Sequence, residues 1–245
     1  MRGWRSVGEV MALDFHVKTR LLSAAAMLCL SGFAGGAETP DAREILKTVR
    51  AAQTAQEQSL TGRVRTGATS VPFRLTFSGG TIRWEFSDPQ QTLQLRLGEK
   101  DSQFEEIGRG GPRKISPAKF DDKVRGTDIS YEDLSMRFLY WPNAAVEGDA
   151  LMLFNKCWVI RVEPPARDAS QYGRVKLWIA KNSGALLQAE AYGRDGKLAR
   201  RFKVISGQSL GDGLWLLKEM RIEDLAAGGG TDRRPSYLEI DKVAK

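Results

Sequence analysis

Histidine and cysteine are nearly absent from this sequence: its 245 residues contain one histidine, His16, and two cysteines, Cys29 and Cys157. Hydrolases of the Ser-His-Asp or Cys-His type need an imidazole as general base. Zinc sites are usually built from several His or Cys ligands. How much of this chemistry remains in the working protein depends on the processing of the N-terminal segment.

Long apolar runs are also missing. Lys18 and Arg20 precede the uncharged run 21–36 (LLSAAAMLCLSGFAGG), which is shorter than the ~20 residues of a membrane-spanning helix. A basic start, a short apolar run and small residues before a polar segment are typical of a secretory signal peptide. We therefore expect residues 1–37 to be a signal peptide cleaved near Ala37, and we expect the protein to reach the periplasm. Translation can start at Met1 or at Met11.

Cleavage at that site removes His16 and Cys29, so Cys157 is the single thiol of the mature chain. Triads, histidine-containing zinc sites, thiolate clusters and an internal disulfide framework are then excluded. The removal of four basic and two acidic residues lowers the net charge from +7 to +5. Because lysine and arginine are scattered among acids, nucleic-acid binding is not expected, whereas transient contact with anionic membrane surfaces is. We expect no catalytic residues, no metal and no cofactor.

The start of the mature chain has the pattern of an amphipathic helix. Thr39 is a good N-cap residue and Pro40 suits the first helical position. Apolar residues then recur at helical spacing, at Ile45, Leu46 and Val49. The sequence predicts a helix of about four turns that ends near Gln58.

From Gly62 onward the apolar period is two, which is typical of antiparallel strands with one buried face. Alternating runs lie at 71–77, 82–86, 93–97, 158–162, 175–179, 187–191, 202–204, 214–222 and 237–243, and Gly, Asp, Asn or Pro residues separate most of them. No composition break divides the chain. We predict a mainly β fold, a single domain over 38–245 and one meandering antiparallel sheet.

One stretch, residues 116–142, interrupts the strands. Ser130 and Asp133 form a near capping box, in which the side chain three residues into the helix reaches back to the cap. Leu134 and Phe138 follow, and Pro142 ends the pattern. We predict a second short helix here, which would act with the N-terminal helix as a lid over the sheet.

A sheet with one apolar face buries it on a second sheet, in a closed barrel or around a ligand. The inward-facing set is rich in large rings and includes Trp158, Trp178 and Leu177. Alternation alone does not distinguish a closed core from a ligand cavity. If a cavity exists, we expect Phe73, Leu75, Phe77, Trp84, Phe86, Leu93 and Leu95 to line it, under a roof of Ile45, Leu46, Val49, Leu134 and Phe138.

Three segments of the chain carry a family resemblance: GTDISYEDL at 126–134, YGRVKLWI at 172–179 and LLQAEAYGRDGKL at 186–198. Together they resemble the LolA-like outer-membrane lipoprotein-sorting proteins. The resemblance implies a strongly curved, open antiparallel half-barrel that shelters the acyl chains of a lipoprotein or another lipid. It also implies a monomer that meets an inner-membrane donor complex and an outer-membrane acceptor. We expect the signature residues Thr127, Asp128, Ser130, Tyr131, Glu132, Asp133 and Leu134 to be mostly structural.

One feature of the better-studied carriers does not transfer. In those carriers an arginine just before an F-R-W…P stretch ties the sheet to the helical lid. This sequence has Gly79-Gly80 near that place instead, and Arg83 is a candidate at a shifted position. The sequence leaves a second function open, an envelope interaction module that transports no cargo. A hydrolase that uses Glu105-Glu106, Asp121-Asp122 or Glu132-Asp133 is a remote third, because adjacent carboxylates usually point apart.

Overall fold

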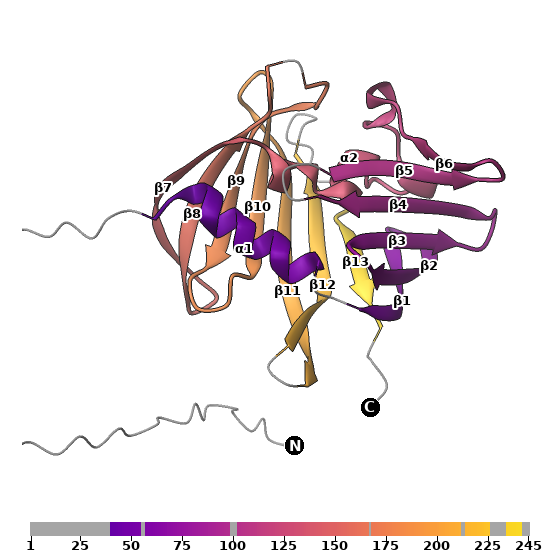
Figure 1. Ribbon diagram of the computed structural model, residues 1–245, viewed down its shortest axis with the longest axis horizontal. Helices are drawn as coiled ribbons and strands as arrows, with labels where there is room; N and C mark the ends of the chain where they lie inside the picture. Colours follow the sequence, from indigo (N-terminus) through magenta and orange to yellow (C-terminus); the bar gives the residue numbers. More distant parts are fainter. Residues whose placement is uncertain are drawn as a thin grey trace, which may run out of the picture. The chain divides into compact units, whose positions relative to one another are not determined.

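A computed structural model describes residues 40–54, 57–98, 102–166, 168–211, 214–225 and 234–241 (Figure 1). The predicted signal peptide at 1–37 and the predicted cap residue Thr39 lie outside the described residues. Within the described part, no helix combines the length and the apolar character needed to cross a bilayer.

The described chain is mainly β. Its helices are α1 (Ala42–Thr54), η1 (Pro117–Lys119), η2 (Val124–Gly126), α2 (Tyr131–Ser135) and η3 (Arg137–Tyr140). Its strands are β1 (Gln58–Thr66), β2 (Thr69–Ser78), β3 (Thr81–Phe86), β4 (Gln91–Leu97), β5 (Ser102–Gly108), β6 (Gly111–Lys114), β7 (Asn143–Met152), β8 (Asn155–Glu163), β9 (Tyr172–Ala180), β10 (Leu186–Gly193), β11 (Leu198–Gly211), β12 (Leu214–Asp224) and β13 (Ser236–Ile240).

The strands form one antiparallel sheet in the order β6-β5-β4-β3-β2-β1-β13-β12-β11-β10-β9-β8-β7. Two meanders, β1–β6 and β7–β13, therefore lie edge to edge, and the pairing of β1 with β13 joins them through registers such as Gly62 with Ile240. The sheet is not closed into a barrel, because β6 and β7 at its two ends do not pair. This confirms the predicted open, mainly β architecture.

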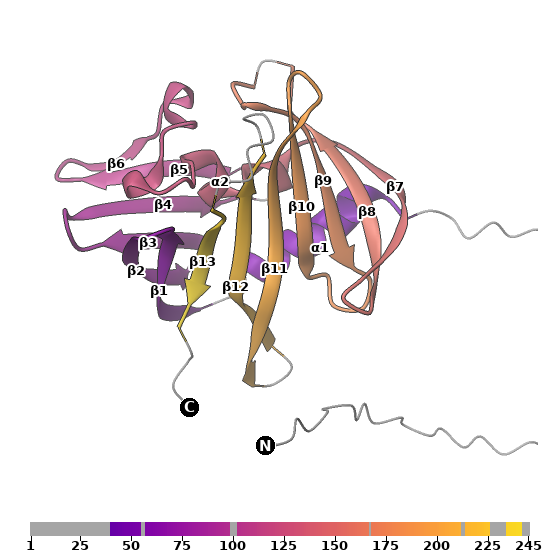
Figure 2. The ribbon, with the colours of Figure 1, turned by 180° about the vertical axis from the view of Figure 1, so that it is seen from behind.

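This strand order dictates the path of residues 115–142, which we call the crossing segment. β6 and β7 are consecutive along the chain but lie at opposite edges of the sheet. The chain between them must therefore pass across the sheet. Figures 1 and 2 show α2, within this segment, where the two meanders meet. The predicted interruption at 116–142 is thus a consequence of topology.

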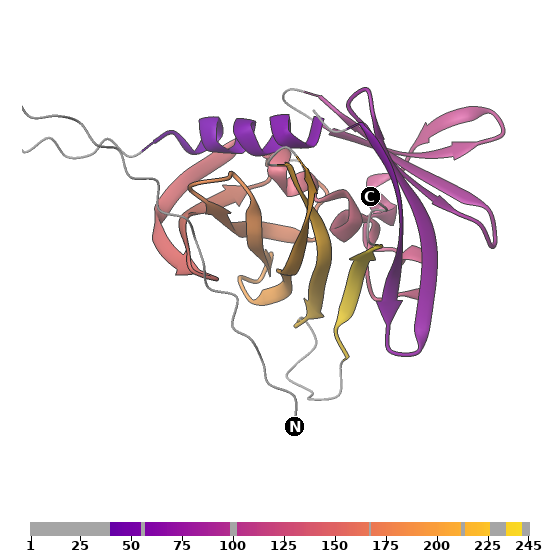
Figure 3. The same cartoon turned by 90° about the horizontal axis from the view of Figure 1, so that it is seen from below.

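The two faces of the sheet differ in character. We call the face beneath α1 and the crossing segment the covered face; it carries fully buried side chains such as Val175, Leu177 and Ile179 on β9. Figure 3 shows α1 lying along one side of the strands of the second meander. Trp178 alternates with these residues and faces the other side, since neighbours in a strand point to opposite faces. The prediction that both Leu177 and Trp178 point inward was wrong.

α1 starts and ends differently from the prediction. It begins at Ala42, and Asp41 is the cap: its Oδ1 accepts a hydrogen bond from Arg43 N at 2.9 Å. Asp serves this position at least as well as Thr, so Pro40 lies before the cap. The helix ends at Thr54, and Gln58, its predicted end, already pairs with Phe77 in the β1–β2 ladder.

Candidate functional site

The candidate site is the apolar cluster on the covered face. The structure buries all seven predicted lining residues, which come from three neighbouring strands: Phe73, Leu75 and Phe77 on β2, Trp84 and Phe86 on β3, and Leu93 and Leu95 on β4. Aromatic rings of neighbouring strands contact one another edge to face, as in the Phe73–Phe86 pair, whose ring centroids lie 6.1 Å apart. The predicted roof residues Leu46, Val49, Leu134 and Phe138 belong to the same cluster, and Ile45 packs against it half-buried.

α1 covers the second meander. It packs mainly against β7 and η3. Its buried face is short, with Ala42, Leu46 and Val49. Arg50 adds a polar link, because its Nη1 donates to the carbonyl oxygen of Leu139 at 2.9 Å and its guanidinium lies 5.6 Å from the centre of the Tyr140 ring. Among the described side chains of α1, an apolar stripe and the contacts of Arg50 hold the helix in place.

The signature at 126–134 forms a buried joint between the crossing segment and the sheet. The predicted capping box of α2 is present: Asp133 N donates to Ser130 Oγ at 3.1 Å, and Ser130 N donates to Asp133 Oδ2 at 2.9 Å. Glu132 accepts hydrogen bonds from Ser170 Oγ and from Gln171 N, which lie just before β9. Both carboxylates of this pair are therefore occupied in holding the segment in place.

The other signature residues serve the same joint. Thr127 Oγ1 donates to the Val124 carbonyl at 2.7 Å and closes a local turn. Tyr131 accepts from Gln91 of β4, so it links α2 to the first meander. Leu134 is buried in the cluster. Asp128 is exposed and serves the joint through its backbone, because its carbonyl oxygen accepts a hydrogen bond from Arg200 Nη2 at 3.2 Å.

Asp133 is the centre of an ion-pair network that crosses three elements. It accepts a hydrogen bond from the Tyr172 hydroxyl at 2.5 Å and lies 3.4 Å from Arg200 Nε on β11. Arg200 is buried, pairs with Asp224 of β12 at 2.8 Å and donates to the Asp128 carbonyl at 3.2 Å. Sequence analysis missed Arg200. Its position between Leu198 and Phe202 on the inward parity was the available signal.

Burial shifts the pKa values of this joint. It raises the pKa of Glu132 from 4.5 to about 7, although the hydrogen bonds from Ser170 and Gln171 oppose the shift. Burial, and then the adjacent Asp133 carboxylate, raise the pKa of the Tyr172 hydroxyl well above its ordinary value. Tyr172 is therefore a neutral donor, whereas Glu132 changes charge near neutral pH.

Three aromatic residues place polar atoms in this buried region without a protein partner in the described part of the chain: Trp84 Nε1, Trp141 Nε1 and the Tyr140 hydroxyl. Burial raises the pKa of Tyr140 to about 12, so its hydroxyl keeps its proton. Buried polar atoms are usually hydrogen-bonded. These three are therefore buried donors that the described residues leave without a partner.

The opposite face of the sheet carries ladders of charge. Arg201 lies between Glu190 and Glu223 on neighbouring strands, at 3.0 and 3.2 Å. Arg83, the shifted candidate for a lid latch, also lies there and donates to Gln94, so it does not reach the lid. Alternating charges make this face a water-facing surface.

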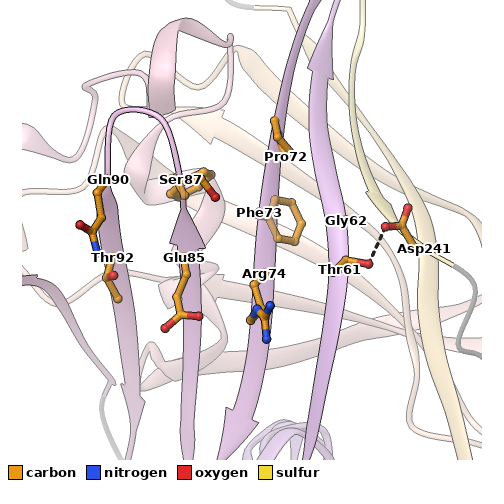
Figure 4. A pocket seen from close by; sticks show the side chains of 11 residues that line it. Thr61, Gly62, Pro72, Phe73, Arg74, Glu85, Ser87, Gln90, Thr92 and Asp241 are labelled. Atoms are coloured by element: carbon orange, nitrogen blue, oxygen red, sulfur yellow. Dashed lines mark hydrogen bonds between the residues drawn. The ribbon is translucent and has the colours of Figure 1, made fainter.

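A pocket of about 610 Å³ lies between β1–β4 and the end of β13 (Figure 4). Polar groups dominate its wall, including the Thr61–Asp241 hydrogen bond at 2.6 Å. Phe73 and Phe86 are the predicted cavity residues that line it; the others line the covered cluster instead. The full lining is Thr61, Gly62, Pro72, Phe73, Arg74, Glu85, Phe86, Ser87, Gln90, Thr92 and Asp241.

The described part of the chain contains a single thiol, and its possible metal ligands are not clustered. Cys157 is buried, and burial raises the pKa of its thiol. Within the described ranges, no three His, Cys, Asp or Glu side chains come together in a way that could hold a metal ion. Glu105 and Glu106 point to opposite faces, since Glu105 binds Arg96 while Glu106 accepts from Gln91.

The fold is that of the LolA-like proteins. A domain named for outer-membrane lipoprotein sorting, from Vibrio parahaemolyticus, has a TM-score of 0.63 at 15% identity, with 82% of this chain and 90% of that chain covered. A LolA superfamily protein from Nitrosomonas europaea has a TM-score of 0.61 at 15% identity, covering 83% and 93%. A DUF1329 family protein from Desulfovibrio piger has 0.56 at 16%, covering 83% and 92%. These likenesses confirm the fold that the signature predicts.

Comparison of the sequence with family models places the chain in one family. A family model with the description "Uncharacterized protein" matches residues 109–244, and the chain belongs to this family. No curated protein matches the sequence. The match spans the crossing segment and the second meander, and therefore includes the buried joint.

Proposed function

We propose that this protein is a periplasmic carrier that shelters the acyl chains of a lipoprotein or lipid against its covered face, for transfer toward the outer membrane. The LolA-like fold supports this proposal, as does the predicted signal peptide at 1–37. The observation that carries it is the weak attachment of α1 above a continuous apolar surface. The proposal includes no catalytic step.

In this mechanism α1 is the movable lid. Displacing it breaks the contacts of Leu46 and Val49 and the Arg50–Leu139 hydrogen bond, but no strand pairing. An acyl chain then takes the place of the helix on the apolar surface. Tyr140, at the end of η3 beneath α1, and the adjacent Trp141 provide donors for the ester or amide carbonyl at the head of the chain.

The energetics favour an incomplete cavity. Burying an acyl chain gains ~0.8 kcal/mol per CH₂, or about 12 kcal/mol for a chain of sixteen carbons. A carrier that kept all of this free energy would not release its cargo. Because α1 occupies the apolar surface when cargo is absent, its displacement offsets part of the gain. A closed resting state is therefore consistent with a carrier.

A reversible staple tests whether α1 must move. Thr48 Cγ2 lies 3.6 Å from the position that a Cβ on Gly184, in the β9–β10 turn, would take. Disulfide-bonded cysteines have Cβ atoms about 3.5–4.5 Å apart. A cysteine sulfur at position 48 can take the place of Thr48 Cγ2, so the two positions are close enough for a disulfide to be engineered. In the Thr48→Cys/Gly184→Cys variant, we expect a fluorescent fatty-acyl probe to bind after reduction and to bind at least tenfold more weakly after oxidation.

The reduced double variant is the internal control, because it carries the same strain at position 184, where φ is +68°. Each single variant controls for the substitution alone. Equal probe binding by the oxidised and reduced forms would show that α1 is not the lid. If the wild-type protein binds no acyl probe, the carrier function is wrong.

The alternative is an interaction module on the same fold, without cargo. The burial of all seven predicted lining residues favours it, because a closed core needs no ligand. It predicts that the wild-type protein leaves the envelope without any acylated species. Native mass spectrometry of protein purified from its own envelope distinguishes the two: a co-purifying acylated mass supports the carrier, and a bare chain supports the module.

A further inference from the structure

The turn between β7 and β8 is unusual for its residue types. The strands end at the Met152–Asn155 pair, so Leu153 and Phe154 are the two turn residues. Both have positive φ, at 48° and 63°. A two-residue turn of this kind is normally Asn-Gly or Asp-Gly, because these residues adopt positive φ at low cost. Two bulky apolar residues at this turn cost the fold stability.

The same residues are also exposed. Phe154 is 99% exposed, Leu151 72% and Leu153 51%. Single exposed apolar side chains are common on soluble proteins and need no explanation. Three of them within four positions form an apolar projection, which we call the hairpin tip, residues 151–154. Figure 2 shows its parent strands β7 and β8 at the outer end of the second meander.

Basic residues stand directly behind the hairpin tip. Lys156 is exposed and pairs in register with Leu151. Lys181 N donates to the Lys156 carbonyl oxygen at 2.8 Å, so the two lysines are neighbours. The Lys181 ammonium lies 3.4 Å from the centre of the Trp158 ring and pairs with Asp149. The surface is thus apolar at its end and has a positive charge excess at its base.

We propose that the hairpin tip is a membrane contact site, which inserts Leu151, Leu153 and Phe154 into the surface of a bilayer with anionic headgroups. Three side chains cannot supply the ~800 Å² per partner that a stable protein interface needs. They suffice for shallow, reversible insertion into lipid, which requires no complementary surface. The exposed Lys156 matches phosphate headgroups in charge, whereas Lys181 is paired with Asp149.

This site is separate from the covered face and does not depend on the proposed cargo. It adds a place where the protein would touch a membrane. The two functional claims therefore fail independently.

Vesicle binding tests the proposal with a variant that removes the apolar residues and also improves the turn. Leu153→Asn/Phe154→Gly gives the favoured residue types for positive φ. We expect it to melt at the same temperature as wild type or higher. We expect its co-sedimentation with phosphatidylglycerol/phosphatidylethanolamine vesicles to fall by about tenfold or more, from the loss of two inserted apolar side chains.

Three comparisons complete the experiment. Each uses protein purified from cells that express the full chain. Ile205→Asn removes an exposed apolar side chain from β11 and should leave vesicle binding unchanged. Lys156→Glu should weaken binding to vesicles that contain phosphatidylglycerol, with little effect on neutral phosphatidylcholine vesicles. Acyl-probe binding should be the same in all variants. The proposal is overturned if the wild-type protein does not bind these vesicles, or if Leu153→Asn/Phe154→Gly binds them equally well.

Discussion

The two covers of the apolar face differ in how the chain holds them. α1 is attached by one short apolar stripe and by Arg50. The crossing segment is attached by a buried capping box, two buried carboxylates and Arg200. Apolar contacts can be exchanged for those of a ligand, whereas buried charges lose their partners when a segment moves. α1 is therefore held in a way that suits opening, whereas the crossing segment is part of the framework of the fold.

The largest effect is expected at the crossing segment. Arg200→Met removes the cation that pairs with Asp133 and Asp224 and leaves two carboxylates without it. We expect a loss of about 3–5 kcal/mol in the free energy of unfolding, measured by urea titration with tryptophan fluorescence. Lys47→Met, which breaks an exposed pair with Glu44, should cost no more than ~0.5 kcal/mol. Similar losses in the two variants would contradict the framework role.

A smaller effect, dependent on pH, is expected at Glu132. Its folded pKa of about 7 lies above the usual 4.5, so the folded state holds the proton more tightly than the unfolded state. The resulting stabilisation is complete below about pH 4.5, decreases between pH 4.5 and 7, and is absent above pH 7. At about 1.4 kcal/mol per pKa unit, its full size is roughly 3 kcal/mol.

Glu132→Gln tests this sign, because glutamine resembles the protonated side chain and does not titrate. Relative to wild type, the variant should gain stability as the pH rises from 4.5 to 7, in urea titrations at several pH values. Glu44→Gln, the same substitution at an exposed position on α1, is the matched control. Parallel curves for Glu132→Gln and wild type would rule out the shifted pKa.

The smallest global effect is expected at α1. Arg50→Met removes the hydrogen bond to the Leu139 carbonyl and should lower the unfolding free energy by about 1 kcal/mol. Amide hydrogen exchange should rise in residues 44–51 and stay unchanged in 131–140. Arg43→Met, on the exposed side of the same helix, is the control. Faster exchange in both segments would show that the two covers open together.

Sequence periodicity located the strands whose inward residues are large. It missed β5, β6 and β7. On β5 the buried Phe104 shares its face with the charged Glu106, so no apolar alternation forms. β6 is four residues with Pro112, and β7 carries small side chains and a bulge near Gly148. The apolar alternation of β1 was not recognised, because packing requires a glycine at one of its inward positions. Gly62 takes an inward position where a Cβ would lie 2.9 Å from Phe73 Cζ and 2.4 Å from the Glu239 carbonyl oxygen. A glycine there interrupts the apolar pattern without interrupting the strand.

The same limit applies to the site: its local features could be predicted from the sequence, and its contacts between distant residues could not. The capping box of Ser130 and Asp133 is local in sequence and was predicted. Tyr172 and Arg200 bind Asp133 of this box from 39 and 67 positions away, and Ser170 binds the adjacent Glu132 from 38 positions away. No local period encodes such pairings. The burial of an arginine on an apolar parity, as at Arg200, is the one sign of the network that sequence alone carries.

The pairing of β13 with β1 has a consequence for the order of folding. Each meander is built from hairpins between neighbours in sequence, but the hydrogen bond from Thr61 to Asp241 joins residues 180 positions apart. Contacts of such separation form slowly, because a long loop must close first. Until β13 arrives, β1 and β12 are open edges, and open edges pair with other chains. A chain that is complete only up to β12 would hold nearly all of its apolar face and yet be at its most prone to aggregate.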